Sequence, residues 1–160
     1  MTQTVMLPDW NLEPLLVKAL DAEEGYGWTL DLALDVAAEY RKYSALCQLY
    51  PDEPLVPSTF VDDFWHLHIL DTLKYEDDCS QYYGYFLHHF PYFGMRGEED
   101  AANLRKSWLA TLELYKKHFG EVPADLWPSS KRCPNCGVRC RGKQHEAAFE
   151  QRPSLADILK

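Results

Sequence analysis

Potential metal ligands are concentrated in one stretch of the chain. Four of the six histidines lie between residues 58 and 93, at His66, His68, His88 and His89. The same stretch holds Cys79, five aspartates and many aromatic residues. Imidazole, carboxylate and thiolate groups bind transition metals, and aromatic side chains keep such a site dry. The stretch therefore predicts a metal site or a polar catalytic site built into an aromatic core.

Helical spacing defines a first candidate site. An α-helix turns about 100° per residue, so Asp62 and His66, four residues apart, share one face. His88 or His89 from the following segment would complete the ligand set. One aspartate and two histidines form a set with open coordination positions, which suits iron(II) or catalytic zinc.

A second candidate site lies on another face of the same helix, because His68 points almost opposite to His66. It pairs His68 with Cys79 and is again closed by His88 or His89. Asp71 or Tyr75 would steady its ligands, and a thiolate with a histidine favours zinc or copper. The groups expected to take part in catalysis at either site are Asp62, His66, His68, Tyr75 and Cys79. The alternative is that each of these groups is a hydrogen-bonded core residue without a metal.

A separate cluster of ligands lies near the C-terminus. It consists of Cys133, Cys136, Cys140 and His145, all within 13 residues. In the C-x-x-C-G pattern, backbone amides reach both thiolates, so this spacing predicts a structural zinc ion with three cysteines and one histidine. A redox C-x-x-C pair or a loose tail is the alternative.

Composition narrows the possible partners and compartment. The 160 residues suit one domain with a small appendage, and the net charge of −9 makes the chain a poor general binder of nucleic acid or anionic membranes. Basic residues around the C-terminal cysteines could still contact RNA or an acidic partner. No apolar run is long enough for a transmembrane helix, and the N-terminus lacks a signal-peptide pattern. We therefore expect a cytoplasmic protein with reduced thiols.

Four helical segments are expected to position the candidate sites. They are a short helix from about Asp9 to Leu20, a helix from Thr29 to about Leu49, a helix from Thr59 to about Asp78, and a helix from Glu98 to about Phe119. The third is apolar on nearly all sides and should be buried at the centre. Ser58 is its expected N-cap, and the segment from Tyr82 to Phe93 continues as a helix or irregular chain.

These elements predict an all-α fold, a bundle of four or five helices around the buried helix of residues 59–78. The predicted organisation is a helical domain at 1–120, a linker at 121–130 and a Cys-rich zinc-binding tail at 131–160. The linker contains prolines and separates two groups of ligands.

The motif W-H-x-H-x-x-D-T at residues 65–72, followed by Cys79 and the pair His88-His89, resembles the glycine-rich domain-containing protein-like family of bacteria, fungi and plants. The similarity extends from about Gly25 to Gly120. We expect the protein to carry the domain shared by the family, without the glycine-rich tail of the plant members. The resemblance implies a common site, without naming its chemistry, at Asp62, His66, His68, Cys79, His88 and His89.

Two function classes follow from these observations. The first is a small metalloenzyme, a metal-dependent hydrolase or oxidoreductase that acts on a small molecule or a peptide. The second is a metal-stabilised module with a closed site that binds a protein partner. Zinc is the expected ion of the tail, and zinc or iron(II) that of the helical domain. The enzyme is preferred because buried ionisable groups are costly unless they have a function.

Overall fold

Most of the chain that the structure describes is helical. The structure is a computed structural model that describes residues 4–129, 136–143 and 150–159. Its helices are α1 (Glu13–Leu20), α2 (Leu30–Leu49), α3 (Thr59–Leu70), α4 (Thr72–Tyr83), α5 (Glu98–Phe119) and the short 3-10 helix η2 (Leu155–Asp157). The strands β1 (His88–Phe90) and β2 (Arg141–Lys143) form a small antiparallel ribbon. The predicted all-α class with four or five α-helices is confirmed.

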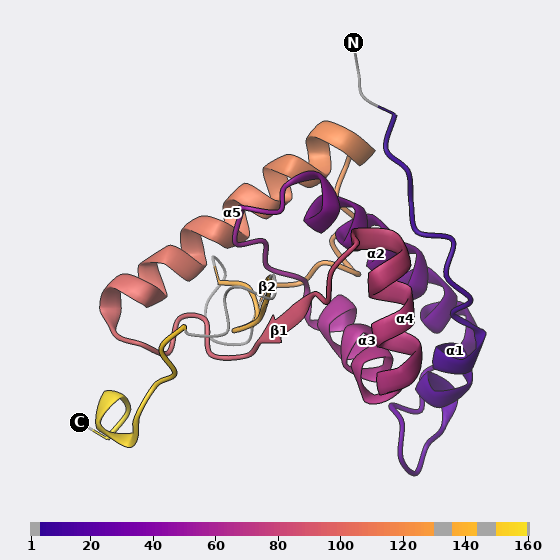
Figure 1. The fold of residues 1–160 in the computed structure, drawn as a ribbon, viewed down its shortest axis with the longest axis horizontal. Coiled ribbons are helices and arrows are strands. Elements are labelled where there is room, and N and C mark those ends of the chain that lie inside the picture. Colours follow the sequence, from indigo (N-terminus) through magenta and orange to yellow (C-terminus); the bar gives the residue numbers. More distant parts are fainter. Residues whose placement is uncertain (1–3, 130–135, 144–149, 160) are drawn as a thin grey trace.

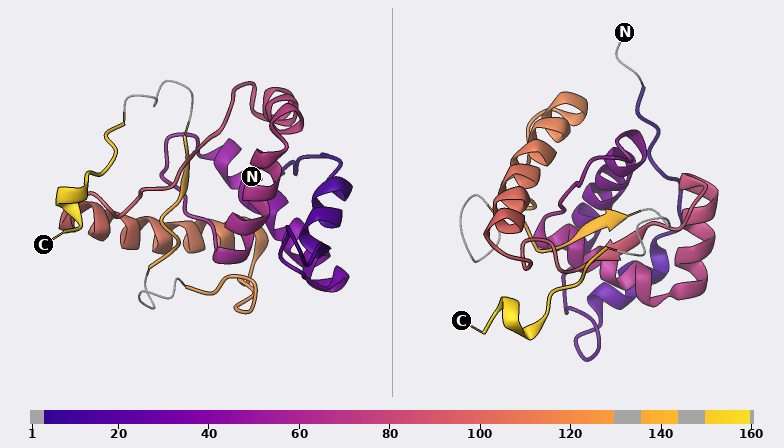
Figure 2. Two further views of the ribbon diagram at one scale, coloured as in Figure 1. Left: turned by 90° about the horizontal axis from the view of Figure 1, so that it is seen from below. Right: turned by 60° about the vertical axis from the view of Figure 1, so that its left-hand side comes forward.

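Helices α1 to α4 group together on one side of the molecule, and α5 extends along the other (Figures 1 and 2). The β1–β2 ribbon lies between these two parts. Helix α2 joins them because it packs against α1 and α3 and also against α5. None of the described helices combines the length and apolarity that crossing a bilayer requires.

The ends of the long helices follow the signals in the sequence. The Thr29 hydroxyl accepts a hydrogen bond from the Leu32 amide, and the Ser58 hydroxyl accepts one from the Val61 amide, both at 3.2 Å. Helix α5 begins with three acidic residues, has basic residues in its last turn and stops at Gly120, whose φ is +85°. Side-chain caps, charges that oppose the helix dipole and a C-terminal glycine each stabilise a helix end.

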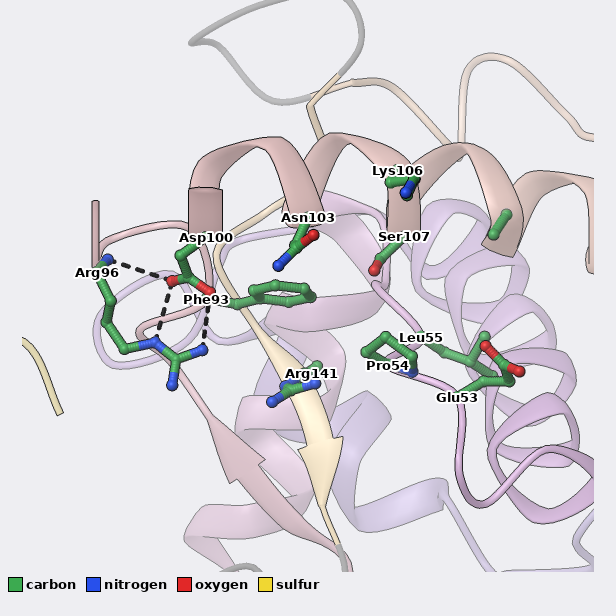
Figure 3. Close-up of a pocket in the computed structure, with 11 residues that line it drawn as sticks. Glu53, Pro54, Leu55, Phe93, Arg96, Asp100, Asn103, Lys106, Ser107 and Arg141 are labelled. Atoms are coloured by element: carbon green, nitrogen blue, oxygen red, sulfur yellow. Dashed lines mark hydrogen bonds and ion pairs between the residues drawn. The ribbon is translucent and has the colours of Figure 1, made fainter. Parts of the chain in front are cut away.

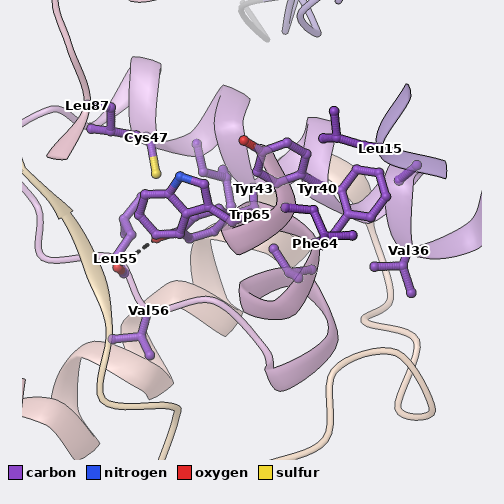
Figure 4. Packing of buried hydrophobic residues seen from close by; sticks show 14 of the residues in the cluster. Leu15, Val36, Tyr40, Tyr43, Cys47, Leu55, Val56, Phe64, Trp65 and Leu87 are labelled. Carbon is purple, nitrogen blue, oxygen red and sulfur yellow. Dashed lines mark hydrogen bonds between the residues drawn. The ribbon is translucent and has the colours of Figure 1, made fainter. Parts of the chain in front are cut away.

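An aromatic core surrounds α3. Trp65 is 1% exposed and packs near Tyr43, whose hydroxyl donates to the Leu55 carbonyl at 3.0 Å (Figure 4). The Trp65 indole donates to the Tyr75 hydroxyl at 2.9 Å, and Tyr75 donates to the Leu87 carbonyl. Buried Tyr and Trp side chains need such partners for their polar tips. The core is therefore both packed and hydrogen-bonded, with α3 at its centre as predicted.

The predicted single helix of residues 59–78 is wrong, because the chain breaks at Asp71. Helix α3 ends at Leu70, Asp71 has φ −83° and ψ 73°, and its carboxylate accepts a hydrogen bond from the Lys74 amide that caps α4. Aspartate favours this position over a helix interior because its side chain competes for backbone amides. Leu70 and Leu73 beside the break are 74% and 81% exposed, so the expected complete burial also fails there.

The C-terminal segment packs against the helical part. Strand β2 pairs with β1 in the register His89 with Gly142 and Phe90 with Arg141. A Cβ atom added to Gly137 would lie 2.3 Å from Val56, so the backbone there is in close contact with the core. For residues 88–90, the expected helix or irregular chain is replaced by a strand. The predicted boundaries at 120 and 131 stay predictions, but residues 136–143 do not stand apart from the helices.

Candidate metal centre

Four potential metal ligands converge where α3 meets the ribbon. They are Asp62 and His66 from α3, His89 from β1 and Cys140 just before β2, and one ligand atom of each lies within 4.8 Å of all the others. His89 Nε2 lies 3.0 Å from His66 Nε2 and 2.9 Å from Asp62 Oδ1. Asp62 Oδ2 lies 3.4 Å from His66 Nε2 and 3.5 Å from Cys140 Sγ.

These separations resemble those of ligands around a single ion. Donors at about 2.0 to 2.3 Å from a tetrahedral zinc ion are about 3.3 to 3.8 Å from one another. The two imidazoles direct the same type of nitrogen, Nε2, toward the shared point. Small side-chain movements would therefore place all four donors around one ion.

The alternation of side chains along the ribbon determines which histidine of the His88-His89 pair contributes. Successive residues in a strand point to opposite faces, and residues directly paired across an antiparallel ribbon share a face. His89 pairs with Gly142, two residues from Cys140, so His89 and Cys140 face α3 together. His88 points to the other face, where its ring lies 4.8 Å from that of Phe86.

The surroundings of the cluster favour a bound cation. Asp62 and His89 are mostly buried, whereas the His66 side chain is 42% exposed. Burial and the carboxylate of Asp62 raise the pKa of Cys140, and burial lowers the pKa of His66 although Asp62 opposes this. Within the part of the chain that the structure describes, no lysine or arginine forms an ion pair with Asp62. A buried carboxylate without a cation is costly, and a metal ion would remove that cost.

His68, expected at the second candidate site, belongs instead to a hydrogen-bonded network. The Tyr40 hydroxyl lies 2.7 Å from His68 Nδ1, and His68 Nε2 lies 2.7 Å from Asp78 Oδ2. Lys74 Nζ lies 2.9 Å from the same carboxylate oxygen. Burial lowers the pKa of His68, so we assign a neutral ring that accepts from Tyr40 and donates to Asp78. Both ring nitrogens are thus occupied by protein groups.

Cys79 and Tyr75 are core residues in this arrangement. Cys79 is fully buried, and burial raises the pKa of its thiol. The Tyr75 hydroxyl is shared between Trp65 and the Leu87 carbonyl. Among the described residues, His68 and Cys79 do not join a second histidine in a group of potential metal ligands, and Asp71 caps helix α4.

The spacing of the C-terminal cysteines predicts Cys140 to be a ligand of the tail and does not connect it with α3. The connection depends on the β1–β2 pairing, and strands of three residues leave no periodic signal in a sequence. Cys133 and His145 lie outside the described residues, whereas Cys136 is buried near the ribbon. The zinc ion of the tail stays a prediction, and Cys140 is a ligand that both sites would require.

Comparisons with known proteins agree with the motif identified in the sequence. Residues 2–116 match the family model described as UCP032817-like. Glycine-rich domain-containing protein 2 of Arabidopsis thaliana is 39% identical over 51 residues, which cover 32% of this chain but only 6% of the plant protein. No solved structure matches the chain. Because the family model covers well over half of the sequence, this chain belongs to the UCP032817-like family, a glycine-rich domain-containing protein-like family.

Proposed function

We propose that the protein is a zinc-stabilised helical module in which Asp62, His66, His89 and Cys140 bind one ion. The observation that supports this is the convergence of four different donors from three separate segments of the chain. A chance gathering of acidic groups on a surface would not include a buried thiol and two directed imidazole nitrogens.

The types of donor favour zinc. Thiolate ligands select zinc or copper(I) over iron(II), while imidazole and carboxylate are both ordinary zinc ligands. Four protein donors fill a tetrahedron, which is typical of a structural site rather than a catalytic one. The geometry thus supports the closed module over the enzyme that the sequence alone favoured.

The proposed ion would join distant parts of the chain. Cys140 and Asp62 are 78 residues apart in sequence. An ion bound to both, and to His89, would fix the ribbon onto α3 and supply the positive charge that the Asp62 carboxylate needs. Binding to folded but not unfolded protein would add directly to stability.

The test uses untagged protein purified without added metal. Elemental analysis should find zinc, and replacement by cobalt(II) should give the intense visible absorption of a four-coordinate site with a thiolate-to-cobalt band. Cys140→Ser should remove the thiolate band and the ion. Cys79→Ser is the matched control, because Cys79 is also a buried cysteine but lies outside the cluster.

The zinc ion predicted for the C-terminal cysteines must be distinguished from the ion proposed at Asp62, His66, His89 and Cys140. If Cys140 serves the cluster, Cys140→Ser, His89→Ala and Asp62→Ala lose the same ion, and Cys136→Ser retains it. If Cys140→Ser instead behaves like Cys136→Ser, while His89→Ala keeps its metal, the proposed ligand set is wrong.

A metalloenzyme is the second candidate, and the exposure of His66 is the observation that favours it. The solvent-facing side of this ring would let water or a substrate reach the ion as a further ligand. Azide added to the cobalt(II) protein distinguishes the two candidates. A closed site leaves the visible spectrum unchanged, whereas an open site binds the anion and shifts it.

A further inference from the structure

A cavity of about 320 Å³ lies on the side of the ribbon opposite Cys140. It is open to solvent on one side and is lined by α5, by residues 53–55 and by Phe93 and Arg141 (Figure 3). Arg141 follows Cys140 directly, and strand alternation turns its side chain away from the metal cluster. The cavity is therefore separate from the proposed zinc site, and its size suits a small metabolite.

Arg141 brings incompletely used hydrogen-bond donors to this cavity. Its guanidinium lies 4.7 Å from the centre of the Phe93 ring, and one terminal nitrogen donates to Glu150 at 2.6 Å. Its Nε is buried and has no hydrogen-bond partner among the described residues. Arg96, by contrast, is fully engaged with Asp100 and Glu150. A guanidinium stays charged at all accessible pH values, so Arg141 at the edge of the cavity favours an anionic acceptor.

One face of α5 adds further donors. Asn103, Lys106 and Ser107 follow the i, i+3, i+4 spacing and line the cavity, and the amide of Asn103 and the hydroxyl of Ser107 point toward its interior (Figure 3). Within the described residues, none of these three side chains forms an ion pair or a hydrogen bond. The opposite wall is apolar and consists of Pro54, Leu55 and Phe93. The cavity thus combines a cationic, donor-rich end with a surface for a carbon skeleton.

We propose that this cavity binds a small organic carboxylate. The carboxylate would accept hydrogen bonds from Arg141, Ser107 and Asn103, with Lys106 adding charge at the rim. The apolar part of the ligand would lie on Pro54 and Leu55. Of the two acidic residues that line the cavity, Asp100 is neutralised by Arg96, and Glu53 is an exposed rim residue that opposes the anion.

The test is an NMR titration of the isotopically labelled protein with benzoate and with benzamide, its neutral equivalent of similar shape. Benzoate should shift the backbone amide signals of Asn103 and Ser107 and bind about tenfold more tightly than benzamide, because only the carboxylate pairs with Arg141. The Lys106→Glu variant should weaken benzoate binding about fivefold, and Glu53→Gln should strengthen it.

Arg105→Glu is the matched control, because Arg105 is an exposed residue of α5 that does not line the cavity. It makes the same change in net charge as Lys106→Glu and should leave benzoate affinity nearly unchanged. If Lys106→Glu and Arg105→Glu weakened benzoate binding equally, the binding would depend only on net charge and not on the cavity, and the proposal would be overturned. Equal affinity for benzoate and benzamide, or no shift of the α5 signals with benzoate, would overturn it as well.

Discussion

His66 and His68 lie two residues apart on α3, yet their surroundings differ completely. His68 is fully buried, and both of its ring nitrogens contact protein groups in a chain that runs from Tyr40 to Asp78 and Lys74. His66 is partly exposed, and its Nε2 meets a second imidazole and a carboxylate at one point. The first group is a closed hydrogen-bonded network, whereas the second gathers four side chains that can each bind a metal ion.

The two groups differ in whether a lysine or arginine neutralises their carboxylate. In the His68 network, the ammonium of Lys74 neutralises the carboxylate of Asp78. In the cluster, Asp62 has no such partner among the described residues, and the proposed zinc ion would take the place of the ammonium. A buried carboxylate therefore indicates a metal site only when no protein cation reaches it.

Removing the metal is expected to produce the largest effect. A chelator should lower the free energy of unfolding by about 4 kcal/mol when free zinc had been at a thousand times its dissociation constant. In His66→Ala the chelator should change stability far less, because one ligand is already gone. Urea unfolding with and without the chelator measures both values. An equal response of wild type and variant would place the stabilising ion elsewhere.

Replacing His68 should destabilise the fold without affecting the metal. His68→Ala leaves a cavity and removes the partner of both Tyr40 and Asp78, which should cost about 3 kcal/mol. Zinc content should stay at the wild-type value, and the loss should be the same with and without a chelator. Zinc loss from this variant would mean that the two groups are not independent.

The sequence was informative wherever local signals determine structure. Helix α2 and helix α5 begin and end close to the predicted residues, because Thr29 caps the first and charged ends with Gly120 delimit the second. The break at Asp71 was missed because the apolar residues on both sides read as one continuous pattern. Asp71-Thr72 at the end of the W-H-x-H-x-x-D-T motif is consistent with the start of a new helix, because aspartate is a common N-cap residue.

This error also affected the assignment of faces. Residues ten apart in a regular helix are about 15 Å apart along its axis, yet His68 and Asp78 are in hydrogen-bond contact. Counting 100° per residue holds within α3, from Asp62 to His66, but it does not apply across Asp71, because His68 and Cys79 belong to two different helices. Cys140 could not be connected with α3, because its position depends on a long-range strand pairing.

Acidification should expose the contribution of His68 on its own. Burial lowers the pKa of His68 in the folded chain, so the unfolded chain binds the proton first as the pH falls. The contribution of His68 to the free energy of unfolding is therefore fully present above its unfolded pKa of about 6.5. It is lost as the pH falls below that value, by at most about 1.4 kcal/mol per pH unit. His68→Gln can keep both hydrogen bonds but cannot titrate.

The difference in unfolding free energy between wild type and His68→Gln should therefore decrease as the pH falls below about 6.5. Loss of zinc at low pH acts on both proteins and cancels in this difference. A difference that does not change with pH would show that His68 titrates alike in the folded and unfolded chains.

The smallest expected effect comes from replacing Lys74. It tests whether Lys74 neutralises the carboxylate of Asp78, as the zinc ion is proposed to neutralise that of Asp62. Lys74→Met keeps the length of the side chain but removes the charge, and should cost about 1 kcal/mol because Lys74 itself is only partly buried. Lys74 is also one of the groups that lower the pKa of His68, so this pKa should rise in the variant, as measured by NMR titration of the imidazole.

Lys18→Met is the control, since it removes an ion pair with Glu24 that is well exposed to solvent and should leave stability unchanged. If Lys74→Met is as harmless as Lys18→Met and the pKa of His68 does not move, Asp78 needs no cation, and the absence of one beside Asp62 would no longer argue for a metal.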